Sequence, residues 1–308
     1  MVIEEQKMRS LAHRMTEVKG RSPWADARRR FWRNKAAMAG LVILILVALF
    51  AIFGSQFAVW SNEELDFTVM GQVATMGAPS WSNGHYFGTD DLGRDLFART
   101  VQGTQISLLV GIVGAGIAVI VGTLYGAVAG YVGGRTDQVM MRTVDILMSI
   151  PYMFVLILLL VMFGRSMSML FLGIGLISWL DMARIVRGQT LSLKNREFIE
   201  AARATGVSTW RIITRHIVPN LLGVVAVYAT LLVPLMILTE SFISFLGLGV
   251  QEPLTSWGAL ISEGAGTMSY GTLWQLAFPL FFFVITLFGF FFVGDGLRDA
   301  LDPKMKRS

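Results

Sequence analysis

The sequence predicts an all-α, polytopic membrane protein with six transmembrane helices, and three observations carry this prediction. Hydrophobic residues make up 54% of the 308-residue chain and charged residues 15%, against roughly 45–50% and about 25% in soluble domains. Six apolar runs are each long enough to cross about 30 Å of hydrocarbon as a helix. Lys and Arg residues gather in alternate connections between these runs, as expected of a chain that crosses a membrane repeatedly.

Composition also excludes several classes of site. The chain has no cysteine, so it has no disulfide framework, thiolate metal site or Cys nucleophile. Its three histidines, His13, His85 and His216, are far apart and form no HExxH pair. The net charge of +5 follows the predicted membrane topology, and we therefore expect no nucleic-acid partner.

Residues 1–35 are predicted to form a cytoplasmic N-terminal arm that ends in an amphipathic interfacial helix. Ser22 is a plausible N-cap and Pro23 a plausible first helical residue. Trp24, Ala27 and Phe31 then share one face of a strongly basic segment. This pattern is typical of a helix on an anionic lipid surface, so membrane lipid is an expected partner. The alternative is a solvated basic run.

The first transmembrane helix is predicted at 36–59 and is followed by an extracytoplasmic loop at 60–104. This loop contains the stretch HYFGTDDLGRDLFART, which is dense in charged residues: Asp90, Asp91, Arg94, Asp95 and Arg99. They suggest either a catalytic or metal cluster, or structural capping and pairing in a short helix. We favour the structural interpretation.

Residues 105–296 are predicted to form a five-helix core. The expected spans are about 106–131, 139–163 with an interruption at Pro151, 167–185, 221–246 and 276–293, with a polar outer loop at 247–273. In the second span, Gly122, Gly126 and Gly130 recur every four residues, a spacing that allows close helix packing in lipid. Residues 297–308 are predicted to form a cytoplasmic tail.

The distribution of Lys and Arg predicts the orientation. Of the 26 such residues, 23 lie in the N-terminal arm, in 132–142, in 184–215 and in the tail. Positively charged connections remain in the cytoplasm. Both termini and the loop at 188–219 are therefore expected inside, and 60–104 and 247–273 outside.

The loop at 188–219 contains a predicted short helix. Asn195 is a plausible N-cap, Glu197 and Glu200 suit the positive helix start, and Gly206 is a natural stop. Four residues fall on one face: Phe198, Ala201, Ala202 and Thr205. One aromatic side chain among small residues is typical of a helix that docks into a groove of another protein. Ser208 is expected to begin a second segment, which Pro219 ends.

These residues also carry a family resemblance. Glu200, Ala201, Ala202, Gly206 and Pro219 match the EAA motif of ABC-importer permeases, with His216 and Val218 in place of the motif's Ile and Leu. The 85–99 stretch resembles the FGTD-x-x-GRD-x-x-x-R signature of the dipeptide and oligopeptide permease family. Two further stretches, ISWLDMARIVRGQTLSLKNREFIEAA and ESFISFLGLGVQEPLTSWGALIS, are most similar to the C subunit of oligopeptide permeases.

The resemblance implies a type I ABC importer permease fold and a function. The chain would be a multi-pass protein of the bacterial inner membrane that pairs with a homologous permease and forms half of the pathway. Two ATPase subunits and an extracytoplasmic substrate-binding protein complete such importers, and a peptide is the substrate. Phe198, Glu200, Ala201, Ala202 and Gly206 would form the coupling helix that docks into an ATPase. Oligopeptides are favoured, with dipeptides, glutathione or nickel chelates as alternatives.

The chemistry within the chain agrees with a transport subunit that is not an enzyme. No GxxxxGK[ST] loop is present, so ATP and Mg²⁺ are expected on the partner ATPases and no cofactor in this chain. Glu240 is a pathway candidate, with helix–helix hydrogen bonding as an equal alternative. Asp145 and Asp181 are expected to have structural roles. An ion-coupled secondary carrier is a more remote alternative, and a membrane enzyme lacks a catalytic set.

Overall fold

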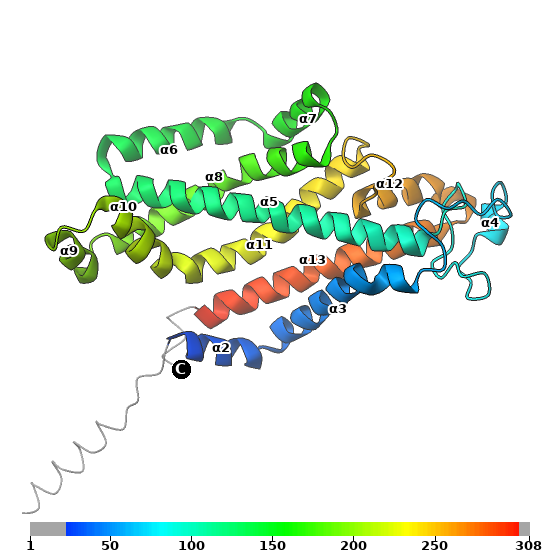
Figure 1. Cartoon of the computed structure of the whole chain (residues 1–308), viewed down its shortest axis with the longest axis horizontal. Helices are drawn as coiled ribbons and strands as arrows, with labels where there is room; N and C mark the ends of the chain where they lie inside the picture. Colours follow the sequence, from blue (N-terminus) through cyan, green and yellow to red (C-terminus); the bar gives the residue numbers. More distant parts are fainter. Residues whose placement is uncertain (1–22, 302–308) are drawn as a thin grey trace, which may run out of the picture.

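The computed structural model describes residues 23–301, and within that range every regular element is helical (Figure 1). Residues 1–22 of the predicted arm, including the predicted N-cap Ser22, and residues 302–308 of the predicted tail lie outside the described residues. The helices are α2 (Pro23–Arg33), α3 (Lys35–Phe57), α4 (Val73–Met76), α5 (Leu96–Val132), α6 (Gly134–Ser149), α7 (Tyr152–Phe163), α8 (Met167–Leu193), α9 (Glu197–Ala204), α10 (Thr209–Ile212), α11 (Val218–Phe245), α12 (Trp257–Thr267) and α13 (Leu273–Leu301).

The long helices run roughly along one axis, with α9 at one extreme of the bundle and α4 and α12 towards the other (Figure 1). We refer to these as the α9 end and the α12 end. Five described helices are long and apolar enough to cross a membrane: α3, α5, α8, the continuous stretch Thr209–Phe245, and α13. The pair α6 and α7 forms a sixth span if it is counted as one, bent by 78°. This count agrees with the six predicted spans.

The packing of α5 on α8 confirms the close approach predicted from the glycine repeat. A methyl group on Gly122 would lie 2.6 Å from Met182 Cβ, and one on Gly126 would overlap the carbonyl oxygen of Ala183. At Gly130 the contact would be 2.8 Å from Thr190 Cβ. Because lipid offers no hydrophobic driving force, such small-residue contacts let the two backbones meet and gain dispersion energy.

Two predicted helix limits are wrong at the α12 end. Helix α5 begins about ten residues before the predicted span, because Asp95 caps it by accepting a 2.7 Å hydrogen bond from the Ala98 N–H. The charged signature therefore opens this long helix and does not form a separate short one. The predicted polar loop at 247–273 contains α12, whose Trp257 is fully buried and donates from Nε1 to Thr104 Oγ1 at 3.1 Å.

Proline acts differently in the two spans that contain a predicted interruption. At Pro151 the helix stops, and the bend between α6 and α7 follows. Pro219 was predicted to end a segment, but the helix continues through it. A π-helical turn at Ile213–Ile217 precedes Pro219, and the Val218 N–H reaches back five residues to the Ile213 carbonyl. This wider turn accommodates a residue that would otherwise clash with the carbonyl four positions earlier.

Helices α2 and α3 pack against α13. Asn34 caps α3 by accepting hydrogen bonds from the N–H groups of Ala36 and Ala37 at 3.1 and 3.2 Å. Gly296 of α13 leaves room for Ala37, and Ala27 of α2 is buried. Trp24 is 58% exposed, and the placement of α2 on a lipid surface stays a prediction.

Candidate functional site

Helix α9 begins and ends close to where the sequence predicts. Its N-cap is Arg196, one residue after the predicted Asn195. Gly206 has φ +77°, and its N–H donates to the Arg203 carbonyl while the Val207 N–H donates to the Ala202 carbonyl at 3.1 Å. This paired arrangement closes the last turn, and the left-handed backbone explains why glycine stands there.

One face of α9 packs onto the chain's own core. Ile199 is fully buried in a cluster with Ile212, Ile213 and Ile217, which come from α10 and the π-helical turn. Ala202 is 9% exposed and belongs to the same cluster. Its predicted place on the exposed docking face is therefore wrong, because at its helical angle the small side chain faces inward beside Ile199.

The other residues of α9 are open. Phe198 is 42% exposed, and Glu200, Ala201 and Gly206 are exposed as well. Because the helix is fixed by its buried residues, the exposed phenylalanine is a rigid apolar contact. Binding through it would cost little conformational entropy. Within the described residues, the predicted set thus remains exposed apart from Ala202.

Several contacts tie the α9 end to the long helices. Arg187 of α8 forms two hydrogen bonds with Asp137 of α6, at 2.6 and 2.9 Å. Lys194 Nζ donates to the Gly130 carbonyl of α5 at 3.3 Å, and the guanidinium of Arg203 lies 5.7 Å from the Tyr131 ring centroid. The Arg203 contact joins α9 to α5, and the other two join α8 and the residue after it to α6 and α5.

His216, the departure from the EAA motif, lies in the π-helical turn and is half-buried. Its carbonyl accepts a 2.6 Å hydrogen bond from Asn220 Nδ2. The side chain of Asn220 thus satisfies a backbone carbonyl in the turn that precedes Pro219.

Glu240 is buried, so the described chain holds it away from any open pathway. Its carboxylate accepts hydrogen bonds from the hydroxyls of Ser244 at 2.6 Å, Ser107 at 3.1 Å and Ser241 at 3.3 Å. Ser107 in turn accepts from the Trp257 N–H at 3.2 Å. The prediction that Glu240 contacts the substrate pathway is therefore corrected. Glu240 joins α5, α11 and α12 through hydrogen bonds, as the alternative interpretation predicts.

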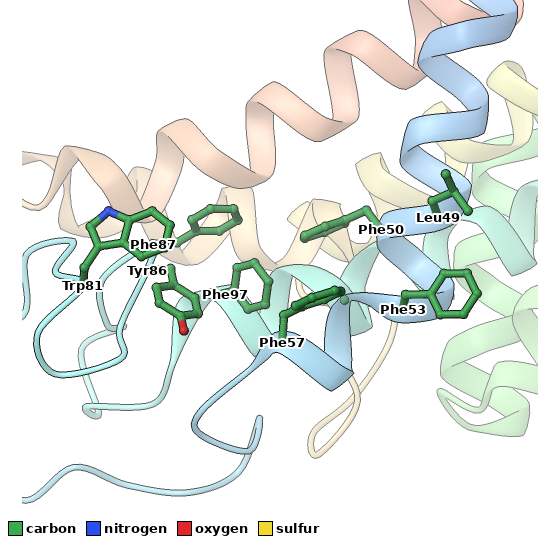
Figure 2. Close-up of a pocket in the computed structure, with 9 residues that line it drawn as sticks. Leu49, Phe50, Phe53, Phe57, Trp81, Tyr86, Phe87 and Phe97 are labelled. Carbon is green, nitrogen blue, oxygen red and sulfur yellow. The ribbon is translucent and has the colours of Figure 1, made fainter.

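An aromatic cavity of about 610 Å³ lies at the α12 end (Figure 2). Its lining comes from α3, from residues 81–87 and from the start of α5: Leu49, Phe50, Phe53, Gly54, Phe57, Trp81, Tyr86, Phe87 and Phe97. No charged side chain is among them, and the polar side-chain groups are the phenol of Tyr86 and the indole of Trp81.

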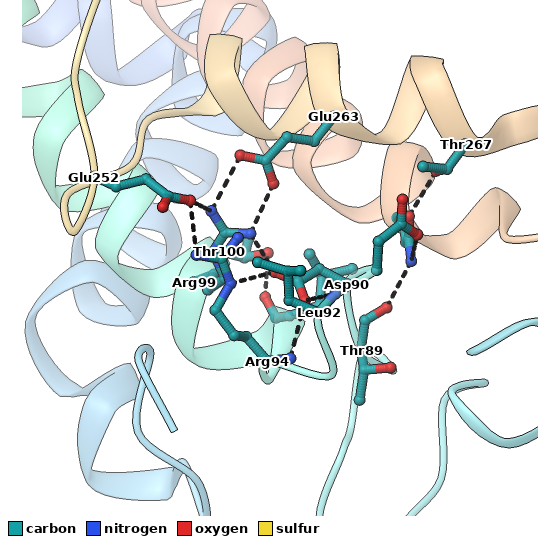
Figure 3. A network of polar contacts seen from close by, with 12 residues as sticks. Thr89, Asp90, Leu92, Arg94, Arg99, Thr100, Glu252, Glu263 and Thr267 are labelled. Carbon is teal, nitrogen blue, oxygen red and sulfur yellow. Dashed lines mark hydrogen bonds and ion pairs between the residues drawn. The ribbon is translucent and has the colours of Figure 1, made fainter. Parts of the chain in front are cut away.

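The charged residues of the 85–99 stretch form a network with the segment that follows α11 (Figure 3). Asp90 Oδ2 binds both Arg94 and Arg99. Arg94 also reaches Glu252 at 2.7 Å, and Arg99 reaches Glu263 of α12 at 2.7 Å. The hydrogen bond from Arg94 holds the pKa of Glu252 below its ordinary value. The network supports the structural interpretation of these residues.

A buried histidine in the same region was not identified from the sequence. His85 is fully buried, with Nδ1 2.9 Å from Asp95 Oδ1 and Nε2 3.4 Å from Asp66 Oδ2, and Trp60 stacks on its ring. The hydrogen bond from Thr68 keeps the pKa of Asp66 below its ordinary value. Across residues 23–301, no group of three His, Cys, Asp or Glu side chains is placed to hold a metal ion.

The remaining two acids in the spans differ from each other. Asp145 accepts a 2.7 Å bond from Arg184, and both side chains are about half exposed. This pair agrees with the predicted structural role. Asp181 is exposed and has no hydrogen bond or ion pair within the part of the chain that the structure describes. It lines a cavity of about 700 Å³ between α7, α8 and α11.

Comparison with known proteins identifies relatives of this chain. Residues 119–307 match the family described as binding-protein-dependent transport system inner membrane component. Residues 22–72 match the N-terminal TM domain of oligopeptide transport permease C. The oligopeptide transport system permease protein OppC of Haemophilus influenzae is 56% identical over 94% of this chain and 91% of its own length. The protein of the same name from Escherichia coli K12 is 59% identical over 94% and 93%.

More distant relatives extend the comparison. The dipeptide transport system permease protein DppC of Bacillus subtilis is 45% identical over 92% of this chain and 86% of its own length. A chain from the inward-facing MetNI methionine ABC transporter matches with a TM-score of 0.54 at 18% identity, over 66% of this chain and 95% of that chain. At that identity the match concerns the fold alone.

Proposed function

The chain belongs to the inner membrane components of binding-protein-dependent transport systems, and from this premise we infer that it is a permease subunit of a peptide ABC importer. Oligopeptides are the favoured substrate, because relatives named as oligopeptide permeases are 56–59% identical over almost the whole chain. Dipeptides are the second candidate, since a permease named for dipeptide transport is 45% identical. Glutathione and nickel chelates have weaker support.

We propose that this subunit works in a complex with a homologous permease, two ATPase subunits and an extracytoplasmic substrate-binding protein. ATP and Mg²⁺ would bind only to the ATPases, and this chain would carry no catalytic site. The protein would lie in the bacterial inner membrane with both termini and α9 in the cytoplasm, as the excess of Lys and Arg at the α9 end favours.

The observation that carries the coupling role is the two-sided structure of α9. Ile199 anchors the helix to the chain's own core, while Phe198, Glu200 and Ala201 are exposed. An isolated membrane subunit gains nothing from an exposed phenylalanine on a polar loop, whereas a docking surface gains an apolar anchor. We propose that Phe198 enters a groove of an ATPase subunit.

The contacts around α9 support a mechanical role for it. Asp137, Arg187 and Lys194 bind at the base of the loop and connect it to α5, α6 and α8. Closure of the ATPases on ATP would move α9 as a rigid element and shift these spans between two arrangements.

The proposal is tested by Phe198→Ala in the complete transporter reconstituted in liposomes. Deletion of the aromatic anchor should reduce ATP-driven uptake of trialanine at least tenfold, since hot-spot truncations cost on the order of 2 kcal/mol or more. The thermal stability of the purified chain should not change by more than about 0.5 kcal/mol, because the side chain is already exposed.

Phe67→Ala is the matched control. Phe67 is 75% exposed and belongs to the connection between α3 and α5, far from α9 in the fold. The same deletion there should leave ATP-driven uptake unchanged. Normal coupling in the Phe198 variant would reject the docking role of α9.

A further inference from the structure

We propose that the cavity between α7, α8 and α11 receives the amino end of the transported peptide, with Asp181 contacting its ammonium group. This inference rests on the proposed function, because it presumes a peptide as the substrate. It assigns a substrate-contacting residue that the EAA motif and the charged signature do not contain.

The position of Asp181 is the first argument. It lies in α8, a helix long and apolar enough to span the membrane, close to the inner end of the predicted span 167–185. The nearest cation along the same helix, Arg184, is already bonded to Asp145 at 2.7 Å. An exposed carboxylate near the end of a span is still costly where it faces lipid, so this side of the bundle faces either water or another protein.

The broken third span gives a second and independent argument. Helix α6 stops at Ser149 and α7 starts at Tyr152, and residues 150–152 between and beside them are exposed. A non-helical backbone at membrane depth is tolerated only where protein covers it or where it lines a water-filled cavity. Tyr152 lines the same cavity as Asp181. The helix break at 150–151 and the unpaired Asp181 therefore border the same cavity.

The hydrogen-bonding groups of the cavity indicate the charge and the donor character of its ligand. Ser178 Oγ already donates to the Ile174 carbonyl at 2.8 Å, and Thr239 Oγ1 donates to the Leu235 carbonyl at 2.9 Å. Their remaining lone pairs accept, as does the carboxylate of Asp181. No Lys or Arg lines the cavity. A wall that mainly accepts hydrogen bonds suits a cationic donor, and an ammonium with three N–H groups fits it.

The rest of the lining suits a ligand whose side chains vary. Met153 and Met236 line the cavity, and methionine adapts to different shapes more readily than branched residues. The volume of about 700 Å³ is in the range of small-molecule sites. A fixed anion beside adaptable apolar groups matches a peptide, whose ammonium is constant and whose side chains are not.

The absence of cysteine from the chain permits a direct test of water access. In the complete transporter, Asp181→Cys should react with a membrane-impermeant methanethiosulfonate, and trialanine supplied with the binding protein should slow the reaction. Leu46→Cys is the control: Leu46 is 60% exposed on the apolar helix α3 and should not react. Failure of Asp181→Cys to react would overturn the proposal.

Uptake measurements test whether the negative charge of Asp181 is needed for transport. Asp181→Asn should lower the rate of trialanine uptake about tenfold, the size expected for one charge-assisted hydrogen bond. Asp181→Glu should retain most of the rate. Asp145→Asn, which removes an acid already paired with Arg184, should stay within twofold of the wild type. Wild-type uptake by the Asp181→Asn transporter would overturn the proposal.

Two further readouts separate this inference from its alternatives. If Asp181→Asn prevents co-purification of the partner permease, Asp181 pairs with that subunit and the proposal is wrong. Stimulation of ATP hydrolysis by the loaded binding protein should persist in Asp181→Asn, whereas loss of α9 docking would abolish it. A transporter with normal coupling in Phe198→Ala would reject the docking role and leave the Asp181 prediction standing.

Discussion

At the α12 end the chain pairs its buried charges internally, whereas at the α9 end Phe198 stays exposed on a helix that Ile199 attaches to the core. Asp90, Asp95 and Arg99 are each at most 5% exposed, and each has a partner within the chain. Phe198 and Trp210 at the other end are 42% and 59% exposed. The charge network at the α12 end is completed by the chain's own residues, whereas the exposed part of α9 is still to be covered.

This difference between the two ends predicts that one set of residues stabilises the fold and another set couples the chain to a partner. Substitutions of the buried residues in the charge network at the α12 end should loosen the chain, because they leave buried charges without partners. Substitutions on the exposed face of α9 should leave the fold intact and affect only what binds there. The predictions below test that division, beginning with the largest expected effect.

Arg99→Leu should destabilise the purified chain by about 3–5 kcal/mol. Arg99 is 3% exposed and binds Asp90 and Glu263, so its removal leaves the buried carboxylate of Asp90 with fewer partners. Thermal unfolding in detergent should show a lowered midpoint.

Arg184→Leu is the comparison at the α9 side of the bundle. Arg184 also pairs with an aspartate, but both side chains are about half exposed. Exposed pairs contribute about 0–1 kcal/mol, so the midpoint should change little. Equal losses in the two variants would contradict the division between the two ends.

Gly206→Val should destabilise the end of α9 by about 1–3 kcal/mol, because φ +77° is strained for a β-branched residue. The site is open, so the cost comes from the backbone alone. Amide hydrogen exchange should accelerate in 203–207 and remain unchanged in α5. Gly116→Ala is the control: no atom lies within 4 Å of the added methyl group, and helical geometry favours alanine. Unaltered exchange at 203–207 would show that the left-handed turn is not needed.

The sequence predicts the stop of α9 and the glycine contacts of α5 because both depend on local backbone geometry. Gly206 ends a helix wherever its left-handed conformation is available, and the repeat from Gly122 to Gly130 lies on one helix face. The structural role of the charged signature is also supported, since opposite charges lie close together along the chain.

Helix limits and buried polar groups are not predictable in the same way. The start of α5 was placed where the apolar run begins, but the helix continues through Arg99 and Thr104, which are buried against other parts of the chain. The burial of Glu240 depends on serines from α5 and α11 that meet only in the fold. Likewise Asp145 and Asp181 look alike in sequence, and only their neighbours distinguish them.

The smallest predicted effect is a pH dependence at the α12 end. The hydrogen bond from Arg94 lowers the folded-state pKa of Glu252 below the ordinary value of 4.5. Its stabilising contribution is therefore complete above pH 4.5 and is lost as the pH falls through the folded pKa. The effect should be small, because Glu252 is 63% exposed and solvent screens the pair. Unfolding midpoints of the wild type and Glu252→Gln should differ slightly at pH 7 and converge in acid. A difference that widens in acid would mean that the carboxylate is destabilising in the fold, which the 2.7 Å contact with Arg94 argues against.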